Sequence, residues 1–403
     1  MPAVSIILPL YNGQPFIRHT ISKIRSQTFQ DWELLVVNDG SSDGGEAAAM
    51  REAQQDHRIR VFRKPNSGIS SARNYGIARA AGTYIAFADQ DDTPFKNWLD
   101  ALYHGMAPDV DLTVGGKKLT VINASGKVVK SRICRYEDIL LETEQELYGF
   151  LFHQEHDASA QHVWNCMYKK ELIDKHGIRF DEQLAMGMED VLFNICYGYY
   201  CRKIHKIPQI VYSYQQRAGI STSTKYNPDL VKEYAHRMQR IARLSADGFR
   251  KQSNGYRMYG DYALRELCNL YFRSRGADSF ELLAGLRDAY VQNVPEKVAV
   301  NFQRQTAEKV KTIVRKMLYA AADDLLRKKR YTPLILLKNG VGQCRKRGKT
   351  DGSQKPDQQK KYFGHRRCHA GPVLLRKCQT DLTGSACSGA LERKRKMRSG
   401  RRG

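Results

Sequence analysis

Strand and helix patterns alternate through the first hundred residues of this 403-residue chain. Residues 4–10 form an almost unbroken apolar run, which is typical of a parallel strand buried on both faces. Further strand patterns follow at Trp32–Val37, Ile59–Arg63 and Thr83–Ala88, with helical patterns between the strands at 16–24, 46–55 and 70–81. Ser70 or Ser71 is expected to cap the third helix. This order predicts an α/β domain whose mainly parallel central sheet is flanked by helices and joined by right-handed crossovers.

The rest of the chain divides into three parts. Residues 101–222 are less regular, with strand patterns at Leu112–Gly115, Lys118–Ile122, Val163–Tyr168 and Ile207–Tyr214 and helical patterns at Asp138–Phe152 and Glu189–Tyr199. A helical region follows, assigned to residues 223–340. Residues 341–403 have few apolar side chains and no periodicity, so we expect a disordered basic tail. An out-of-frame 3′ end would give the same abrupt change of composition.

The net charge of +24 is concentrated towards the carboxyl end. Residues 341–403 hold 18 Lys and Arg against 4 Asp and Glu, or +14, so +10 remains for the other 340 residues. That distribution favours anionic substrates or an anionic membrane surface over specific binding of nucleic acid. The basic and apolar residues of Lys309–Lys329 fit either a helix on a membrane or a helical hairpin packed on the core.

The apolar and cysteine patterns bear on the compartment. No segment approaches the roughly 20 apolar residues of a membrane span, and the N-terminus lacks the pattern of a secretory signal. The nine cysteines include no CxxC pair, and the tail has no zinc-site spacing of Cys and His. The sequence therefore predicts a cytoplasmic protein with reduced thiols.

An acidic cluster, Asp89-Gln90-Asp91-Asp92, directly follows the fourth strand pattern. Carboxylates held this close repel one another, and a divalent cation is the usual remedy. Oxygen ligands suit Mg²⁺ or Mn²⁺ held together with substrate phosphates. Ligands of open α/β sheets bind at the carboxyl ends of the strands, where this cluster lies. The alternative is a solvated turn that caps the following helix.

Several motifs occur together and in order. They are Pro9-Leu10-Tyr11-Asn12, Asn38-Asp39-Gly40-Ser41, the segment 66–74, the acidic cluster, Val163-Trp164-Asn165 and Gly187-Met188-Glu189-Asp190. Taken as a set, these motifs make the chain resemble the family 2 glycosyltransferases of the GT-A fold. Within that family it is most similar to the bacterial exopolysaccharide, capsule and cell-wall branch. The resemblance covers about residues 2–222. It implies a GT-A domain at 1–222, with a nucleotide-binding half at 1–100 and an acceptor half at 101–222.

The resemblance also implies a donor site. Asp39 would accept a hydrogen bond from a uracil imide, and the backbone of Pro9 and Tyr11 would line the base pocket. The alternative for Asp39 is an Asx-turn before Gly40. Arg73 would lie near the diphosphate of a nucleotide-sugar donor, which the resemblance implies to be UDP-linked; a solvated helix arginine is the alternative.

The acidic cluster and the later Glu-Asp pair take further roles by the same resemblance. Asp91 would ligate Mn²⁺ or Mg²⁺, Asp89 would contact the metal or the ribose, and Gln90 belongs to the same donor site. Asp190 would be the general base that deprotonates an acceptor hydroxyl, with Glu189 beside it, and transfer would invert the anomeric carbon. The alternative for Glu189 and Asp190 is that they are simply acids at a helix N-terminus, where the helix dipole favours negative charge.

The implied acceptor is a growing saccharide, carried on a lipid at the cytoplasmic face of the membrane. The chain departs from the family pattern at two positions, with Asn38 in place of an Asp and Cys166 in place of a Lys. Gln215, Arg217 and Ser221 lie where the family often has polar groups that close over the donor. Two other classes remain: a metal-dependent nucleotidyltransferase, although the first strand lacks a Gly-rich basic phosphate loop, and a non-enzymatic basic protein that binds membrane or nucleic acid.

Overall fold

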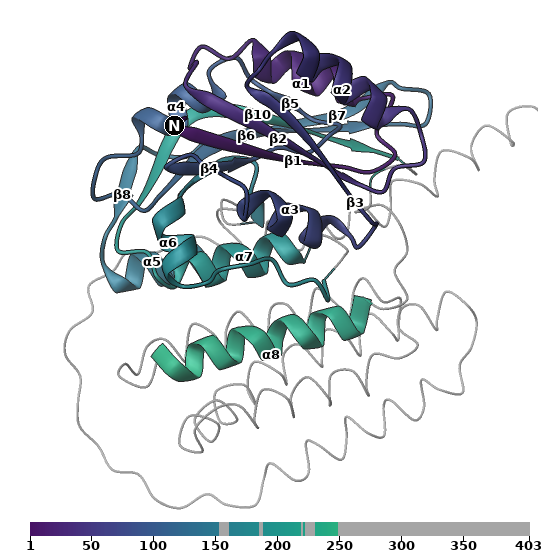
Figure 1. Cartoon of the computed structure of the whole chain (residues 1–403). Coiled ribbons are helices and arrows are strands. Elements are labelled where there is room, and N and C mark those ends of the chain that lie inside the picture. Colours follow the sequence, from purple (N-terminus) through teal and green to yellow (C-terminus); the bar gives the residue numbers. More distant parts are fainter. Residues whose placement is uncertain (153–160, 185–187, 219–220, 222–229, 249–403) are drawn as a thin grey trace, which may run out of the picture. The chain divides into compact units, whose positions relative to one another are not determined.

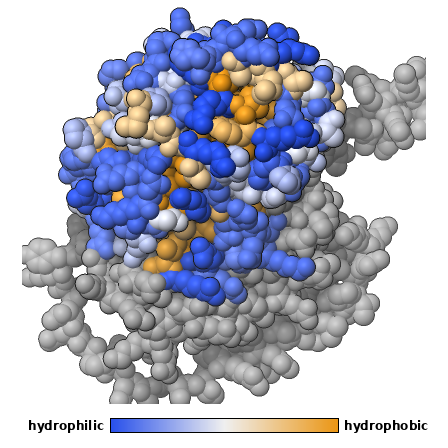
Figure 2. Space-filling view, in the orientation of Figure 1, coloured by the Kyte–Doolittle hydropathy of each residue, from blue (hydrophilic) through white to orange (hydrophobic). Residues whose placement is uncertain are grey.

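A computed structural model of the chain describes residues 1–152, 161–184, 188–218, 221 and 230–248 (Figure 1). The predictions for the helical region beyond residue 248 and for the basic tail lie outside these residues. None of the described helices is both long and apolar enough to cross a membrane. The face of the described residues seen in Figure 2 is mainly hydrophilic, and its apolar side chains gather in small patches.

Four parallel strands form the first half of a ten-stranded sheet, in the order β3-β2-β1-β4. Their bounds are Val4–Leu10 for β1, Trp32–Asp39 for β2, Ile59–Lys64 for β3 and Tyr84–Phe87 for β4. Every residue of β1 and β2 is buried, because helices cover both faces of this part of the sheet. The predicted α/β alternation of the first hundred residues is thus confirmed.

The second half of the sheet mixes strand directions. Its strands are β9 (Cys166–Lys169), β6 (Leu112–Ile122), β10 (Ile204–Arg217), β5 (Thr93–Pro94), β7 (Val128–Cys134) and β8 (Ile139–Leu141). Strand β9 runs antiparallel to both β4 and β6, whereas β6 and β10 are parallel to each other. The short strands β5, β7 and β8 pair antiparallel with β10 or β6. The parallel arrangement predicted for the sheet therefore holds for its first half, and the second half is mixed.

Helices lie on both faces of the sheet. They are α1 (Ile17–Arg25), α2 (Gly45–Gln55), α3 (Ile69–Ile77), α4 (Trp98–His104), α5 (Glu144–Phe152), α6 (Lys170–Lys175), α7 (Glu189–Gly198) and α8 (Leu230–Gly248). Side chains alternate along β1, so Ile6 joins the core under α1, α2 and α4, and Ile7 joins the core with α3, α5 and α7. Figure 1 shows α1 and α2 above the sheet and α3 and α7 below it.

Three local expectations differ from the structure. Helix α3 has Gly68 at its N-cap position with a φ of 91°, and the Ser70 hydroxyl donates to the carbonyl of Leu184 instead of capping the helix. The helix expected over Asp138–Phe152 is a short strand, β8, followed by α5. The two strand patterns between 112 and 122 form one continuous strand, β6, because its neighbours β10 and β7 pair along its length.

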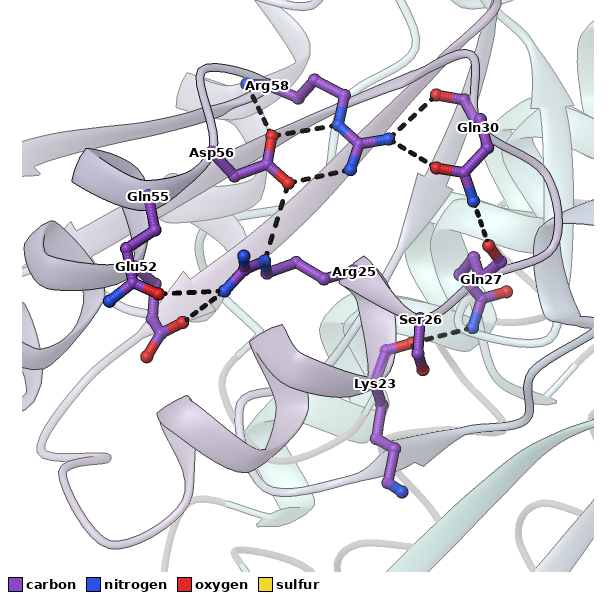
Figure 3. Close-up of polar contacts among 9 residues, drawn as sticks. All are labelled: Lys23, Arg25, Ser26, Gln27, Gln30, Glu52, Gln55, Asp56 and Arg58. Carbon is purple, nitrogen blue, oxygen red and sulfur yellow. Dashed lines mark hydrogen bonds and ion pairs between the residues drawn. The ribbon is translucent and has the colours of Figure 1, made fainter.

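An ion-pair network fastens α1 to α2 and to the start of β3 (Figure 3). The Arg25 guanidinium lies 3.1 Å from Glu52 and 3.7 Å from Asp56. Arg58 in turn donates two hydrogen bonds to Asp56, at 3.0 and 2.8 Å, and one each to the backbone and side-chain oxygens of Gln30. The hydrogen bonds from Arg58 lower the pKa of Asp56 below its usual value. The network fixes the helix pair that covers one face of the parallel half of the sheet.

Asp56→Asn is expected to lower the free energy of unfolding by about 1 kcal/mol at pH 7. A carboxylate with a depressed pKa stabilises the fold fully above its unfolded-state pKa of about 3.9, and loses that effect as pH falls through the lower folded-state pKa. Urea denaturation should therefore show a difference from the wild type that shrinks in acid. Asp31→Asn, at an exposed position, is the matched control, with an effect below about 0.5 kcal/mol. A difference that is constant with pH would contradict this assignment.

Candidate active site

The candidate site lies where β1, β2 and β4 end. In the sheet register Leu10 pairs with Asn38, and Ile7 pairs with Phe87, so the segments that follow these strands emerge at the same edge. The segment after β1 begins with Tyr11, β2 itself ends at Asp39, and the segment after β4 carries the acidic cluster. This is the edge at which ligands of open α/β sheets bind.

Asp39 is held by the turn before α3. Its carboxylate accepts hydrogen bonds from the backbone N–H groups of Ser67 (3.0 Å) and Gly68 (2.8 Å), and Lys64 Nζ lies 2.5 Å away. Its side chain is 4% exposed. The Asx-turn alternative for Asp39 is wrong, because the turn is made by Asn38, whose Oδ1 accepts from the N–H of Ser41 (3.0 Å). The structure thus gives the Asp39 carboxylate a fixed orientation, and Asn38 has a structural role of its own.

Tyr11 and Gln90 form a pair across the first and fourth strand ends. Gln90 accepts from the Tyr11 N–H (2.8 Å) and donates to the Tyr11 carbonyl (3.0 Å), so the amide fixes this backbone. A Cβ at Gly13 would lie 2.3 Å from Gln90 Oε1, so only glycine leaves room for the pair. Pro9 is buried in β1 opposite Val37. The Tyr11 ring is half exposed and free to meet a flat ligand.

Arg73 is the centre of the site. Its side chain is 1% exposed, and its guanidinium lies 3.0 Å from Asp89, 3.2 Å from Glu189 and 2.6 Å from Asp190. It also lies over the ring of Phe180, 5.0 Å from the centroid. The expected neighbour of Arg73 was a diphosphate, whereas its partners here are three carboxylates from distant parts of the chain. One cation therefore joins the acidic cluster to the Glu-Asp pair.

Glu189 and Asp190 begin α7 and are buried. Asp190 Oδ2 also accepts from the N–H of Val163, at 3.4 Å. Burial raises the pKa of Asp190 to about 7; Arg73 opposes the rise, and repulsion from Glu189 and Asp89 adds to it. The N-terminal acids favoured by the helix dipole are thus also part of a buried charge cluster.

Asp91 faces a second arginine. Arg217, at the end of β10, lies 2.8 Å from Asp91 Oδ2 and packs over the ring of Phe16. Burial and repulsion from Asp89 raise the pKa of Asp91 to about 6, although Arg217 opposes the rise. Asp89 and Asp91 are each about a quarter exposed, so both carboxylates reach the surface of the site.

Asp92 is fully buried and has a structural contact. Its Oδ1 accepts from the N–H of Gln215 (2.8 Å), which ties β10 to the acidic cluster, and its Oδ2 has no hydrogen-bond partner among the described residues. Burial, with repulsion from Asp91 and Asp89, raises its pKa well above the usual value. Of the two roles considered for Asp92, the cap on the next helix is wrong, because Asn97 occupies the N-cap position of α4; a contact with the metal through water stays a prediction.

An aromatic layer extends the site away from the donor-side strands. Tyr212 accepts from the N–H of Asp89 (3.0 Å) and stacks on Trp164, which also stacks on His162, with ring centroids 4.6 and 4.7 Å apart. Lys117 is fully buried, with its Nζ 5.6 Å from the Trp164 ring centroid. Sequence reasoning missed Tyr212 and Lys117. Their signals are slight: an aromatic in a strand pattern and a lysine next to a buried Gly-Gly.

Cys166 stands where the family usually has a lysine. Its thiol is buried, burial raises its pKa to about 12, and the charge of Lys117 opposes that rise. The side chain of Lys117 thus brings a positive charge close to this position from the neighbouring strand β6.

Asp89 and Asp91 could supply part of the ligand set of a divalent cation. Asp89 and Asp91 offer carboxylate oxygens on one loop, whereas the described residues contain no group of three or more His, Cys, Asp or Glu placed to hold a metal ion. A cation there would need further oxygen ligands from a bound diphosphate, which is the usual arrangement for Mg²⁺. It would also need to compete with Arg217 for Asp91.

Comparison with known proteins identifies the domain. Residues 5–177 match the family model described as glycosyl transferase family 2. These residues are a family 2 glycosyltransferase domain. The match includes Asp39, Arg73, Asp89 and Asp91, and Asp190 lies beyond its end. The rival prediction of a nucleotidyltransferase is not favoured.

Three curated relatives are named as glycosyltransferases. EpsJ of Bacillus subtilis (strain 168), described as uncharacterized, is 31% identical over 233 residues, covering 57% of this chain and 65% of EpsJ. EpsH of the same organism, described as putative, is 27% identical and covers 53% of this chain and 61% of EpsH. GlyA of Streptococcus pneumoniae is 28% identical, covering 54% of this chain and 31% of GlyA. The matched part of the chain therefore spans less than two thirds of each of these relatives.

Solved structures share the fold. S. aureus TarS 1-349 superposes with a TM-score of 0.56 at 18% identity, covering 73% of this chain and 82% of that one. The same protein in complex with UDP-GlcNAc gives a TM-score of 0.57 at 20% identity, with the same coverage. This likeness confirms the expected GT-A-like α/β fold.

Proposed function

We propose that the chain is an inverting glycosyltransferase, which moves a sugar from a nucleotide-sugar donor to a hydroxyl of a saccharide acceptor. The contacts of Arg73 carry the proposal, because they join Asp89 on the donor side to Glu189 and Asp190 on the acceptor side. A displacement between two bound substrates needs this proximity of donor site and base. The family match of residues 5–177 supports the reaction class.

The donor would be UDP-linked. Asp39 is oriented by two backbone N–H groups and retains acceptor capacity for a base imide, since a carboxylate has about four lone-pair positions. Tyr11, held by Gln90 next to Pro9, would lie against the base. The TarS neighbour, solved with UDP-GlcNAc, supports a donor of this type.

Asp89 and Asp91 would hold a divalent ion, Mn²⁺ or Mg²⁺, against the donor diphosphate. When bound, the ion supplies Lewis-acid stabilisation of the charge on the leaving nucleoside diphosphate. Arg217 lies next to Asp91 and offers a second positive charge to the same phosphates. Asp92 would keep β10, and hence Arg217, in place.

Asp190 would act as the general base. It takes the proton of the acceptor hydroxyl while that oxygen bonds to the anomeric carbon and the bond from this carbon to the diphosphate breaks on the opposite side. A carboxylate whose pKa is raised towards neutrality by burial is well matched to this task. Glu189 would orient the acceptor or support the base.

The acceptor would be a growing cell-surface saccharide, lipid-linked at the inner face of the cytoplasmic membrane, with the protein bound peripherally. The names of EpsJ, EpsH and GlyA support a glycosyltransferase, and the acceptor follows from the resemblance to their branch. A panel of UDP-sugars, assayed for UDP release with Mn²⁺ and a saccharide acceptor, tests the proposal. Release from none of the donors would count against a UDP-dependent transferase.

Asp91→Ala is expected to abolish metal-stimulated turnover of the UDP-sugar, because it removes a carboxylate that the cation shares with the diphosphate. UDP release is measured with and without added Mn²⁺. Asp100→Ala is the matched control, because Asp100 is a partly exposed carboxylate of α4. This variant should turn over the UDP-sugar as fast as the wild type does. Undiminished turnover in Asp91→Ala would remove Asp91 from the metal site.

A further inference from the structure

Strands β6 and β7 form a hairpin with an unusual charge pattern. Residues 117–135, here called the basic hairpin, contain six Lys and Arg and no Asp or Glu. Four of these cations are exposed: Lys127, Lys130, Arg132 and Arg135. The neighbouring exposed segment 137–138 is acidic, so the change of sign is local.

The same hairpin exposes large aliphatic side chains. Val128, Val129 and Ile133 are 53%, 58% and 53% exposed, and all three lie on β7 between the cations. Among the described residues β7 pairs with β6 alone, so its other edge is open (Figure 1). Charged residues alone would protect an edge strand from pairing with another chain, whereas exposed valines and isoleucine favour such association. Interleaved apolar and basic side chains match the interface of an anionic bilayer.

The hairpin lies next to the candidate active site. In the register of β6 with β10, Ile122 pairs with Arg217, and the Arg217 guanidinium is the ion-pair partner of Asp91. The turn of the hairpin, at 123–127, therefore begins beside the strand end that carries a site residue. A surface docked on the hairpin would lie close to the end of the site that holds Arg217 and Asp91.

We propose that the basic hairpin docks the protein on an anionic membrane surface, with Val128, Val129 and Ile133 among the lipid headgroups and the four exposed cations against lipid phosphates. The inference rests on the proposed lipid-linked acceptor, which it would bring to the edge of the candidate active site. It differs from the amphipathic stretch Lys309–Lys329 considered from the sequence.

Sedimentation of the full chain with vesicles tests this. The vesicles are phosphatidylcholine, with or without phosphatidylglycerol. The wild type should bind those with the anionic lipid, and binding should weaken at high salt. The triple variant V128S/V129S/I133S keeps the charge and should bind on the order of tenfold more weakly. The variant K130Q/R132Q should lose about 25-fold, since each basic residue near the surface contributes about fivefold.

A matched control is available on β8. I139S/L140S also removes two exposed aliphatic side chains, but these lie between the acids Asp138 and Glu142, so it should bind as the wild type does. Because all these positions are exposed, the variants should unfold at the wild-type temperature. Membrane binding without sugar transfer to any acceptor would defeat the proposed function and leave the hairpin assignment standing.

Three outcomes would overturn the proposal. The first is a wild-type protein that does not bind anionic vesicles. Undiminished vesicle binding by the triple serine variant, with loss in K130Q/R132Q, is the second; it would show that the contact is electrostatic alone and that the aliphatic side chains do not enter the bilayer. The third is a wild-type dimer in solution that the serine variant dissociates, with no change in vesicle binding, because β7 would then pair with a second copy of this chain.

Discussion

Asp190→Asn is expected to slow sugar transfer by about 10²–10⁴-fold while the donor binds as tightly as it does to the wild type. The side chain keeps its size, and its amide oxygen can still accept from Arg73, although the NH2 group in place of Oδ2 cannot accept from the N–H of Val163. What it loses is the ability to take a proton from the acceptor hydroxyl. The defect should therefore appear in kcat for transfer and not in donor affinity.

The measurement combines steady-state transfer with the affinity for UDP in the presence of Mn²⁺. Glu189→Gln is the informative companion, because Glu189 contacts the same guanidinium and begins the same helix. We expect a smaller loss there, mainly in acceptor KM. Full transfer by Asp190→Asn, with a large loss in Glu189→Gln, would reassign the base to Glu189.

Arg73→Met is expected to lower the free energy of unfolding by about 3–5 kcal/mol. The guanidinium is almost completely buried and compensates Asp89, Glu189 and Asp190, two of which are themselves buried. Removing one partner from a buried ion cluster leaves charges that must stay uncompensated or take up protons, and both are costly. Arg73→Lys should lose less stability, because it keeps the charge but not the planar fork that reaches all three carboxylates.

Urea denaturation at neutral pH measures this effect. The matched control is Arg60→Met, which removes an arginine that is half exposed and pairs with a single carboxylate, Glu33. Its cost should be about 1 kcal/mol or less. An Arg73→Met protein as stable as the wild type would show that the cluster does not depend on this cation.

A feature of the fold could be predicted where residues close together in the sequence determine it, and not where distant residues do. The apolar run of β1 and the turn before α2 are visible in the sequence because burial on two faces demands continuous apolar residues. The direction of β9 cannot be predicted from the sequence, since the same side chains suit a buried strand whether its neighbours are parallel or antiparallel. The cap of α3 was mispredicted because Ser70 found a partner, Leu184, far along the chain.

Sequence patterns alone were enough to predict the parallel half of the sheet, the family that the domain resembles and the residue types at the strand ends. Their spacing along the chain reflects strand and loop lengths, which are local. The folded chain was needed to see that Arg73 lies among Asp89, Glu189 and Asp190, and that Arg217 faces Asp91. Those contacts join residues 16 to 126 positions apart, so they depend on how the sheet brings its strand ends together.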